Sequence, residues 1–279
     1  MRFAVNTPNF GIYSDPRLVA DLAREADEAG WDGFFIWDHF LWTWPEPQPV
    51  ADPFVLLTAM AMSSSRLKLG ALVTPIARRR PWKLAREIAT LDHLTGGRMV
   101  MGAGIGGDWF GDYSAFGESP DDKAHGEMLD EGLDVITGLW SGETFSYEGS
   151  HYKVKDALFL PPPVQRPRVP VWIAGMWPNK RPFRRAARWD GVCPLRKDDE
   201  LMTPDDHKAV LEFIREHRTD DGPFDLIHGG TPTEGTSSDA DKIGPFAEAG
   251  VTWWMEDLSE RRGSLEHIRA RIQAGPPRI

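Results

Sequence analysis

Eight short apolar segments, separated by stretches with helical periodicity, constrain the fold of this 279-residue chain more than any other feature. Each segment is too short to be a core helix, and most are rich in aromatic or β-branched residues. Their near-continuous apolarity is typical of parallel strands that are covered on both faces. The segments are residues 3–5, 33–37, 67–73, 99–102, 171–174, 191–193, 224–227 and 251–255.

Helix signals fall between these segments. Asp15 and Pro16 suit the N-cap and first position of a helix that ends at Gly30, and Pro81 begins another. Further helices are predicted over residues 124–140, 180–188, 204–217, 240–249 and 265–274. Eight strand–helix units predict an α/β fold, a closed (β/α)8 TIM barrel that forms a single domain over residues 1–279. An open doubly wound sheet is the alternative.

Two insertions interrupt the repeat. One follows the fourth strand, at about residues 105–123. The other precedes the fifth strand, where Phe145, Tyr147, Tyr152 and Val154 alternate around a turn that contains Gly149, which predicts a hairpin. Prolines at 161–163 then force an extended connector, because proline cannot continue a ladder or a helix.

Composition excludes several classes of protein. The net charge of −10, with both signs interspersed, argues against nucleic acid or an anionic membrane as the main partner. The lone cysteine, Cys193, excludes an internal disulfide and is expected to be a small buried residue. No apolar run is long enough to span a bilayer, and the first residues are too polar for a signal peptide. A reducing cytoplasm is the expected location.

Residues 142–175 carry the most distinctive order of features: the hairpin, the proline connector and a short strand that ends at Gly175. This order, inside a repeated strand–helix chain, resembles the luciferase-like monooxygenase family. The resemblance implies a barrel enzyme, a flavin-dependent oxidoreductase that works at the face of a reduced flavin, either FMN or the deazaflavin F420. Site residues are then expected at the carboxyl ends of the strands.

The second strand ends in Trp37, Asp38, His39 and Phe40. A carboxylate beside an imidazole can tune it for proton transfer, although a structural aspartate and a histidine bonded to backbone would leave the same pattern. The resemblance places a histidine here, close to the flavin ring, and the F420 branch has Asp-His-Phe at this point. His39 and Asp38 are therefore catalytic candidates.

The third and fourth strands end in small residues, which let a ligand approach the backbone. The resemblance implies cofactor contacts at Ala71 and Leu72, joined by a non-proline cis peptide, and at Gly104 and Gly106. Some F420 dehydrogenases of the family carry a catalytic glutamate at the position of residue 107, which is glycine here. Asp108, one residue later, is the third catalytic candidate.

Three consecutive arginines, Arg78, Arg79 and Arg80, follow the third strand. They could hold an anionic substrate or a phosphate. A solvated basic turn before a helix is the alternative.

The fifth strand ends in Gly175 and Met176, and a helix begins near Lys180 or Arg181. A glycine turn followed by a helix N-terminus can form an anion site. The resemblance implies that the cofactor phosphate binds here, through the backbone of Gly175 and Met176 and with Arg181 as a charge partner.

Aromatic residues near the predicted mouth suggest an apolar or aromatic substrate pocket, formed by Trp42, Trp44, Trp109 and Trp177. His228, at the end of the seventh strand, could reach a substrate or could cap a loop. The histidines show no metal-binding spacing, so no metal site is expected.

Several functions remain open from the sequence: a barrel hydrolase without flavin is one alternative, and three others involve a flavin, of which the first leads. The first is a monooxygenase that uses reduced FMN and O2 on a small organic substrate, with a separate flavin reductase as a possible partner. The second is an F420-dependent hydride-transfer oxidoreductase, and the third is a non-catalytic flavin-binding protein. The resemblance also implies a homodimer.

Overall fold

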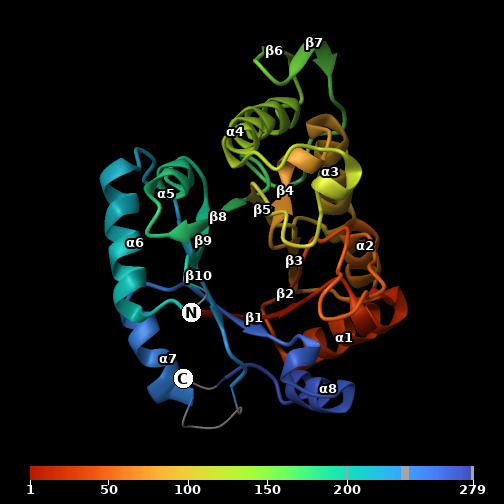
Figure 1. Ribbon diagram of the computed structural model, residues 1–279, viewed down its shortest axis with the longest axis vertical. Helices are drawn as coiled ribbons and strands as arrows, with labels where there is room; N and C mark the ends of the chain where they lie inside the picture. Colours follow the sequence, from red (N-terminus) through yellow and green to blue (C-terminus); the bar gives the residue numbers. More distant parts are fainter. Residues whose placement is uncertain (199, 234–238, 278–279) are drawn as a thin grey trace.

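The computed structural model describes residues 1–198, 200–233 and 239–277, and it shows the predicted α/β barrel (Figure 1). Its parallel sheet has the strand order β3-β2-β1-β11-β10-β9-β8-β5-β4. The strands are β1 (Arg2–Thr7), β2 (Gly33–Ile36), β3 (Lys68–Ala71), β4 (Thr74–Pro75), β5 (Met101–Gly104), β8 (Val171–Trp177), β9 (Gly191–Arg196), β10 (Asp225–Gly230) and β11 (Trp253–Asp257). Every predicted strand is confirmed; β4 is a two-residue strand that follows β3 and pairs with β5.

The two ends of the sheet meet beside β3. A parallel bridge joins Leu69 to Met99, the Leu69 N–H donates to the Arg98 carbonyl at 3.0 Å, and the Val100 N–H donates to the Leu69 carbonyl at 2.8 Å. The sheet therefore closes on itself, and the alternative of an open doubly wound sheet is wrong.

Helices cover the outside of the barrel (Figure 1). They are α1 (Pro16–Ala29), α2 (Pro53–Ser63), α3 (Pro81–Thr95), α4 (Asp122–Leu139), α5 (Lys180–Ala186), α6 (Pro204–His217), α7 (Asp239–Glu248) and α8 (Leu265–Gln273), with 3-10 turns η1 (Gly11–Ser14), η2 (Ile76–Arg78), η3 (Ser114–Phe116) and η4 (Glu260–Arg262). The Asp15 carboxylate caps α1, and Gly30 ends it in the left-handed region with φ 93°. Helix α2 was not among the predicted helices, because its apolar residues follow one another without helical periodicity.

Three aromatic rings fill the centre of the barrel. Phe35, Trp172 and Trp253 lie with ring centroids 5.4–5.9 Å apart, and Cys193 packs against this interior cluster as expected. Glycines on neighbouring strands make room for the rings and for close strand contacts. A Cβ at Gly70 would lie 2.2 Å from the Val100 carbonyl oxygen, closer than atoms can approach. The barrel is thus a packed core, and chemistry is left to its carboxyl-terminal face.

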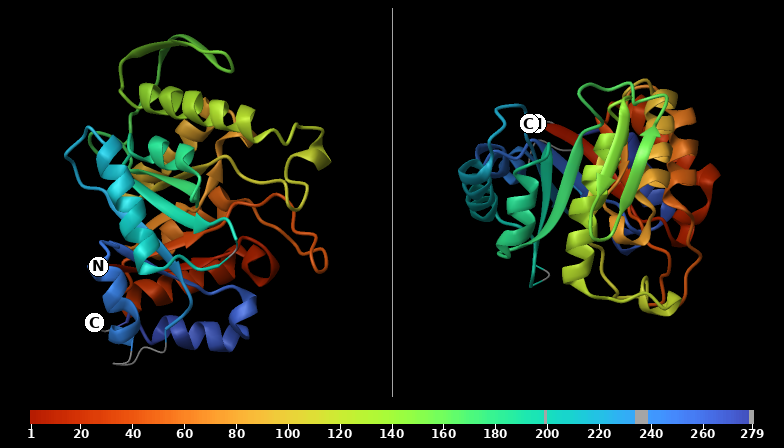
Figure 2. Two further views of the ribbon diagram at one scale, coloured as in Figure 1. Left: turned by 60° about the vertical axis from the view of Figure 1, so that its left-hand side comes forward. Right: turned by 90° about the horizontal axis from the view of Figure 1, so that it is seen from above.

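The predicted hairpin forms from β6 (Thr144–Glu148) and β7 (Lys153–Leu158) and lies over α4, outside the barrel (Figure 2). The Glu131 carboxylate of α4 fixes its turn by accepting the N–H groups of Ser150, His151 and Tyr152 at 2.8, 2.8 and 3.0 Å. Burial opposes the ionised form of Glu131, but these hydrogen bonds prevail and lower its pKa. These hydrogen bonds therefore hold the hairpin in one position on α4.

The connector after the hairpin is attached to α3. The buried Asp92 carboxylate accepts the N–H groups of Val164 and Gln165 at 2.8 and 3.0 Å and the Gln165 side-chain amide at 2.7 Å.

Among the described residues, no helix combines the length and apolar character that crossing a bilayer requires.

We expect Gly70→Ala to destabilise the protein by about 2–3 kcal/mol, since the new methyl group must push β3 away from β5. Gly244→Ala is the matched control, because no atom lies within 4 Å of its Cβ position in α7. That substitution should stabilise by up to about 1 kcal/mol through helix propensity. Urea unfolding measures both; equal stabilities for the two variants would contradict the packed-barrel description.

Candidate active site at the carboxyl ends of the strands

The His39 imidazole lies just after β2, inside an aromatic enclosure. Its ring centroid is 5.5 Å from those of Trp42 and Phe110, 6.1 Å from that of Phe10 and 6.3 Å from that of Trp37. The side chain keeps 17% of its surface exposed. Apolar rings thus orient the imidazole while one edge stays accessible.

Asp112, from the insertion after β5, holds the imidazole by hydrogen bonding. His39 Nδ1 lies 3.0 Å from Asp112 Oδ2, and the other carboxylate oxygen accepts the Phe40 N–H at 2.7 Å. Burial disfavours the charged carboxyl, but these hydrogen bonds and the charge of Arg78 prevail and lower the pKa of Asp112. An ionised Asp112 can only accept, so a neutral His39 donates from Nδ1 and leaves Nε2 free.

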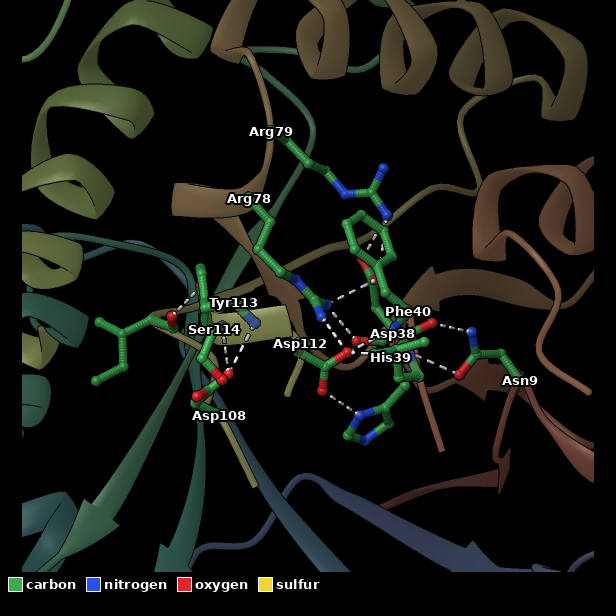
Figure 3. A network of polar contacts seen from close by, with 12 residues as sticks. Asn9, Asp38, His39, Phe40, Arg78, Arg79, Asp108, Asp112, Tyr113 and Ser114 are labelled. Carbon is green, nitrogen blue, oxygen red and sulfur yellow. Dashed lines mark hydrogen bonds and ion pairs between the residues drawn. The ribbon is translucent and has the colours of Figure 1, made fainter. Parts of the chain in front are cut away.

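Two arginines bind the two carboxylates of this region (Figure 3). Arg78 contacts Asp112 Oδ1 at 2.8 Å and Asp38 Oδ1 at 3.1 Å, while Arg79 contacts Asp38 Oδ2 at 2.9 Å. The Arg78 side chain is only 2% exposed and lies 4.4 Å from the Phe40 ring centre. Charges of both signs are therefore buried together in what we call the Asp–Arg network.

The Asp–Arg network corrects two expectations. Asp38 does not contact the adjacent imidazole; its carboxylate turns toward η2, because successive side chains of an extended segment point to opposite sides. Asp112 takes the expected place. Arg78 and Arg79 are neither a solvated turn nor free to bind a phosphate, since their charges already compensate Asp38 and Asp112. A catalytic role for His39 remains a prediction.

Sequence reasoning missed Asp112. One signal was present: the carboxylate stands between Phe110 and Tyr113, whose aromatic rings favour burial of that loop. A buried carboxylate requires a cationic or N–H partner. The sequence does not reveal that this partner lies after β2.

Asn9 fixes the backbone of the same segment. Its side-chain amide donates to the carbonyls of His39 and Ala51 at 2.9 and 2.8 Å, and its side-chain oxygen accepts the His39 N–H at 3.1 Å. The imidazole is thus positioned through both its ring and its main chain.

Asp108 lies apart from the imidazole (Figure 3). Its carboxylate accepts the N–H groups of Tyr113 and Ser114 at 2.7 and 3.0 Å, which caps η3. Hydrogen bonds from the Ser114 hydroxyl and from these N–H groups lower the pKa of Asp108. Its contacts are those of a structural cap.

The cofactor candidates on β3 lie at the mouth of the barrel. Ala71 is buried and Leu72 is partly exposed, and the non-proline cis peptide joins Leu72 to Val73. The expectation of a cis bond between Ala71 and Leu72 is therefore wrong by one residue. The Leu72 N–H still donates to the Ile36 carbonyl at 2.7 Å, so the ladder keeps the preceding peptide in its regular form.

The glycines after β5 stand where side chains cannot be placed. A Cβ at Gly104 would lie 2.8 Å from the Val73 side chain, and Gly106 has φ +73° with its Cβ position 2.8 Å from Pro75. A Cβ at Gly107 would lie 2.9 Å from the Trp109 ring. Glycine is therefore favoured by Val73 at residue 104 and by the positive φ and Pro75 at residue 106, whereas at residue 107 the neighbouring ring is exposed.

The three residues predicted to bind the cofactor phosphate, Gly175 and Met176 of β8 and Arg181 of α5, face different parts of the structure. Gly175 faces α5, where a Cβ would lie 2.6 Å from Pro182, and Met176 is partly exposed. Helix α5 begins at Lys180, as predicted. Arg181 is exposed, and its guanidinium lies 3.7 Å from the Cβ position of Gly126 on α4. The cation of Arg181 thus lies between α5 and α4.

The four tryptophans do not form one pocket wall. Trp42 is buried and stacks on Phe10 with centroids 3.8 Å apart, whereas Trp44 and Trp109 are 61% and 69% exposed. Trp177 lines a cavity of about 330 Å³ together with Arg196 and Lys197. The structure therefore brings only Trp42 against His39.

His228 is oriented away from the mouth. It is 2% exposed and packs against His207 of α6, Phe246 of α7 and Trp254 of β11. The expectation that it could reach a substrate is wrong, because Ile227 faces the barrel interior and the next side chain must face the helices. Burial, followed by the charges of His207 and Lys242, lowers the pKa of His228 to about 3.

The carboxyl-terminal face of the barrel thus presents a histidine that is bound to a carboxylate inside aromatic rings. Comparison with known proteins identifies the family: residues 1–227 match the luciferase-like monooxygenases, so the chain belongs to that family.

A curated relative from Microbacterium testaceum (strain StLB037), an F420-dependent glucose-6-phosphate dehydrogenase, is 31% identical over 192 residues, which cover 67% of this chain and 55% of the relative. A relative of the same description from Nocardia farcinica (strain IFM 10152) is 30% identical over 214 residues, with 75% and 61% covered. The chain thus spans little more than half the length of the curated relatives it matches.

Solved structures show the same fold. An F420-dependent secondary alcohol dehydrogenase in complex with an F420-acetone adduct superposes with a TM-score of 0.78 at 17% identity, over 98% of this chain and 97% of the other.

We expect Asp112→Ala to destabilise the protein by about 3–5 kcal/mol, because it leaves Arg78 buried with only one carboxylate partner and orphans the Phe40 N–H. Asp108→Ala, which removes a partly exposed cap from the same loop, should destabilise the protein much less. Chemical denaturation measures both. Equal losses would contradict the central place of Asp112.

The stability of the protein should also depend on pH through His228. The pKa of this imidazole is about 3 in the folded state, against an ordinary value of 6.5 for an unfolded chain. Between these two pH values the unfolded chain therefore binds one proton more than the folded protein. Stability should fall as the pH drops from 6.5 toward 3, with a slope of up to about 1.4 kcal/mol per pH unit. His228→Phe should flatten this part of the profile, whereas His267→Phe, on an exposed position of α8, should not. Identical profiles for both variants would refute the assignment.

Proposed function

We propose that this protein is an F420-dependent oxidoreductase that transfers a hydride between the deazaflavin and a small organic substrate. The observation that carries the proposal is the His39–Asp112 pair at the end of β2, inside an aromatic enclosure at the face where barrel enzymes act. Relatives that are 30–31% identical over two thirds or more of the chain are described as F420-dependent, which supports this choice of cofactor.

The carboxyl-terminal face suits a flat ring. Ala174 is small and partly exposed, and Gly229 is exposed with no atom within 4 Å of its Cβ position. Gly104 lies close to Ala174, since its Cβ position is 3.6 Å from the Ala174 methyl group. Small residues on β8 and β10 thus leave the backbone open to a planar ligand, with His39 at one side.

In the proposed reaction the cofactor and the residues of the site would have different roles. F420 when bound would supply or accept the hydride. His39 would hold or move a proton at Nε2, where it can contact a substrate oxygen, while Asp112 keeps Nδ1 protonated and stabilises the imidazolium that forms. Trp42 and Phe110 would exclude water from this pair.

The substrate need not be a sugar phosphate. Residue 107 is glycine, and the Trp109 ring occupies the space that a side chain at this position would need. A catalytic carboxylate at residue 107 is therefore excluded. We propose a small organic substrate whose reaction needs one proton-transferring group.

A second candidate is a monooxygenase that uses reduced FMN and O2, with a separate flavin reductase as its partner. The glycine at residue 107 favours it, because this chain departs there from F420 dehydrogenases that carry a second acid. We also propose a homodimer for either function. Exposed apolar side chains on neighbouring helices, Val55 and Met62 of α2 and Leu94 of α3, support a self-association surface.

The proposal is tested by turnover under anaerobic conditions. Oxidised F420 should be reduced by small secondary alcohols or related hydride donors without oxygen, as followed by loss of deazaflavin absorbance. His39→Gln should lower kcat by about 10²–10⁴-fold with F420 affinity kept, since it removes proton transfer but not the ring contacts. His217→Gln, within α6, is the matched control and should be unchanged.

Two outcomes would overturn the proposal. Turnover that requires both reduced FMN and O2 would establish the monooxygenase instead. Binding of F420 without turnover of any hydride donor would favour the non-catalytic flavin-binding protein.

A further inference from the structure

A cavity of about 370 Å³ lies between the start of α3, the start of α4 and the hairpin, and we call it the α3–α4 cavity. Polar side chains that line it include Arg80, Ser119, His125 and Tyr152. His39 is not among its described lining residues. The α3–α4 cavity is therefore separate from the candidate active site, although both adjoin the Asp–Arg network.

The Tyr152 hydroxyl is the most informative feature of the α3–α4 cavity. Tyr152 is 5% exposed, and its buried hydroxyl has no hydrogen-bond partner among the described residues. The Glu131 carboxylate holds Tyr152 in this position, because it accepts the Tyr152 N–H and so fixes the hairpin turn on α4. A buried hydroxyl without a partner is costly, so this one, beside a cavity, is available to donate to a bound group.

Charge at the α3–α4 cavity selects the kind of ligand. Arg78 and Arg79 line it as well, but their two positive charges are compensated by the carboxylates of Asp38 and Asp112. The Arg80 residue is exposed, and its guanidinium makes no ion pair or hydrogen bond with the described residues. One uncompensated guanidinium thus remains at the cavity.

Arg80 and Tyr152 act on one another. Burial raises the pKa of Tyr152 to about 12, and the charge of Arg80 opposes this rise. Both side chains line the α3–α4 cavity, so one ligand there can contact both. Glu118 also lines the cavity, but it is exposed and can turn its carboxylate to water.

We propose that the α3–α4 cavity binds a small oxyanion, a phosphate or carboxylate group, through the Arg80 guanidinium and the Tyr152 hydroxyl. A guanidinium offers two parallel N–H donors to such a group, and the hydroxyl adds a third donor. Ser119 and the buried His125 provide further polar atoms at the same cavity. The oxyanion is either a free ion or an anionic group at the end of a larger ligand held at the mouth.

The test is calorimetric titration of the whole protein with inorganic phosphate at low ionic strength. Arg80→Gln should weaken phosphate binding by tenfold or more, and Tyr152→Phe by about threefold to tenfold. Arg184→Gln, which removes an exposed arginine without described partners from α5, should leave binding unchanged. Absence of phosphate binding, or equal affinity in all four proteins, would overturn the proposal.

A stability measurement guards against misfolded variants. Because the Tyr152 hydroxyl has no protein partner, Tyr152→Phe should be at least as stable as the wild type without phosphate and should gain less stability when phosphate is added. A variant that is less stable without phosphate would show that the hydroxyl serves the fold, which contradicts the proposal.

The source of the oxyanion is distinguished by repeating the titration with F420 present. Loss of phosphate binding, together with weaker F420 binding by Arg80→Gln, would show that an anionic group of the cofactor fills the α3–α4 cavity. Unchanged phosphate binding would show that it takes a separate anion. Either result supports an oxyanion site, and the titration without F420 remains valid if the proposed cofactor is wrong.

Discussion

The compensation of two buried carboxylates by two buried arginines is the constraint on which the candidate site depends. Asp38 follows β2, Arg78 and Arg79 follow β4, and Asp112 belongs to the insertion after β5. None of these charges could stay in its place alone, because an unpaired buried charge costs several kcal/mol. Three chain segments are thereby locked to one another, and the His39 imidazole is bound to the assembled unit through Asp112. Arg78 therefore holds the imidazole in place through Asp112.

The barrel interior explains why the chemistry lies where it does. Phe35, Trp172 and Trp253 fill the centre, so a ligand can approach only from the ends of the strands. Alternation along each strand then decides which side chains face that end. On β10 it turns Ile227 inward and His228 toward α6 and α7, while Gly229 stays open at the mouth. The insertions add what the regular repeat lacks: one supplies Asp112, and the hairpin supplies Tyr152.

Much of this architecture follows from local sequence, and the site follows only in part. Strands and most helices could be predicted because their signals lie within a few residues, as with Asp15 and Gly30 around α1. Helix α2 could not be predicted, because its almost continuous apolar run shows no helical periodicity. His39 could be singled out by its position after a strand, but its partner could not, since Asp112 lies 73 residues away and ion pairs across the fold leave no local pattern. The same limit applies to Arg78 and Arg79, whose burial depends on carboxylates that the sequence does not place beside them.

Through its hydrogen bond, Asp112 fixes the orientation of the His39 ring and keeps the proton of the neutral ring at Nδ1 rather than at Nε2. The most direct measurement is the nitrogen-15 NMR spectrum of the His39 imidazole, assigned by comparison with His39→Gln, at a pH where the ring is neutral. We predict a ring protonated at Nδ1 in the wild type and a mixture of both tautomers in Asp112→Asn. A wild-type ring protonated at Nε2, or a spectrum unaffected by the loss of the Asp112 charge, would contradict this prediction.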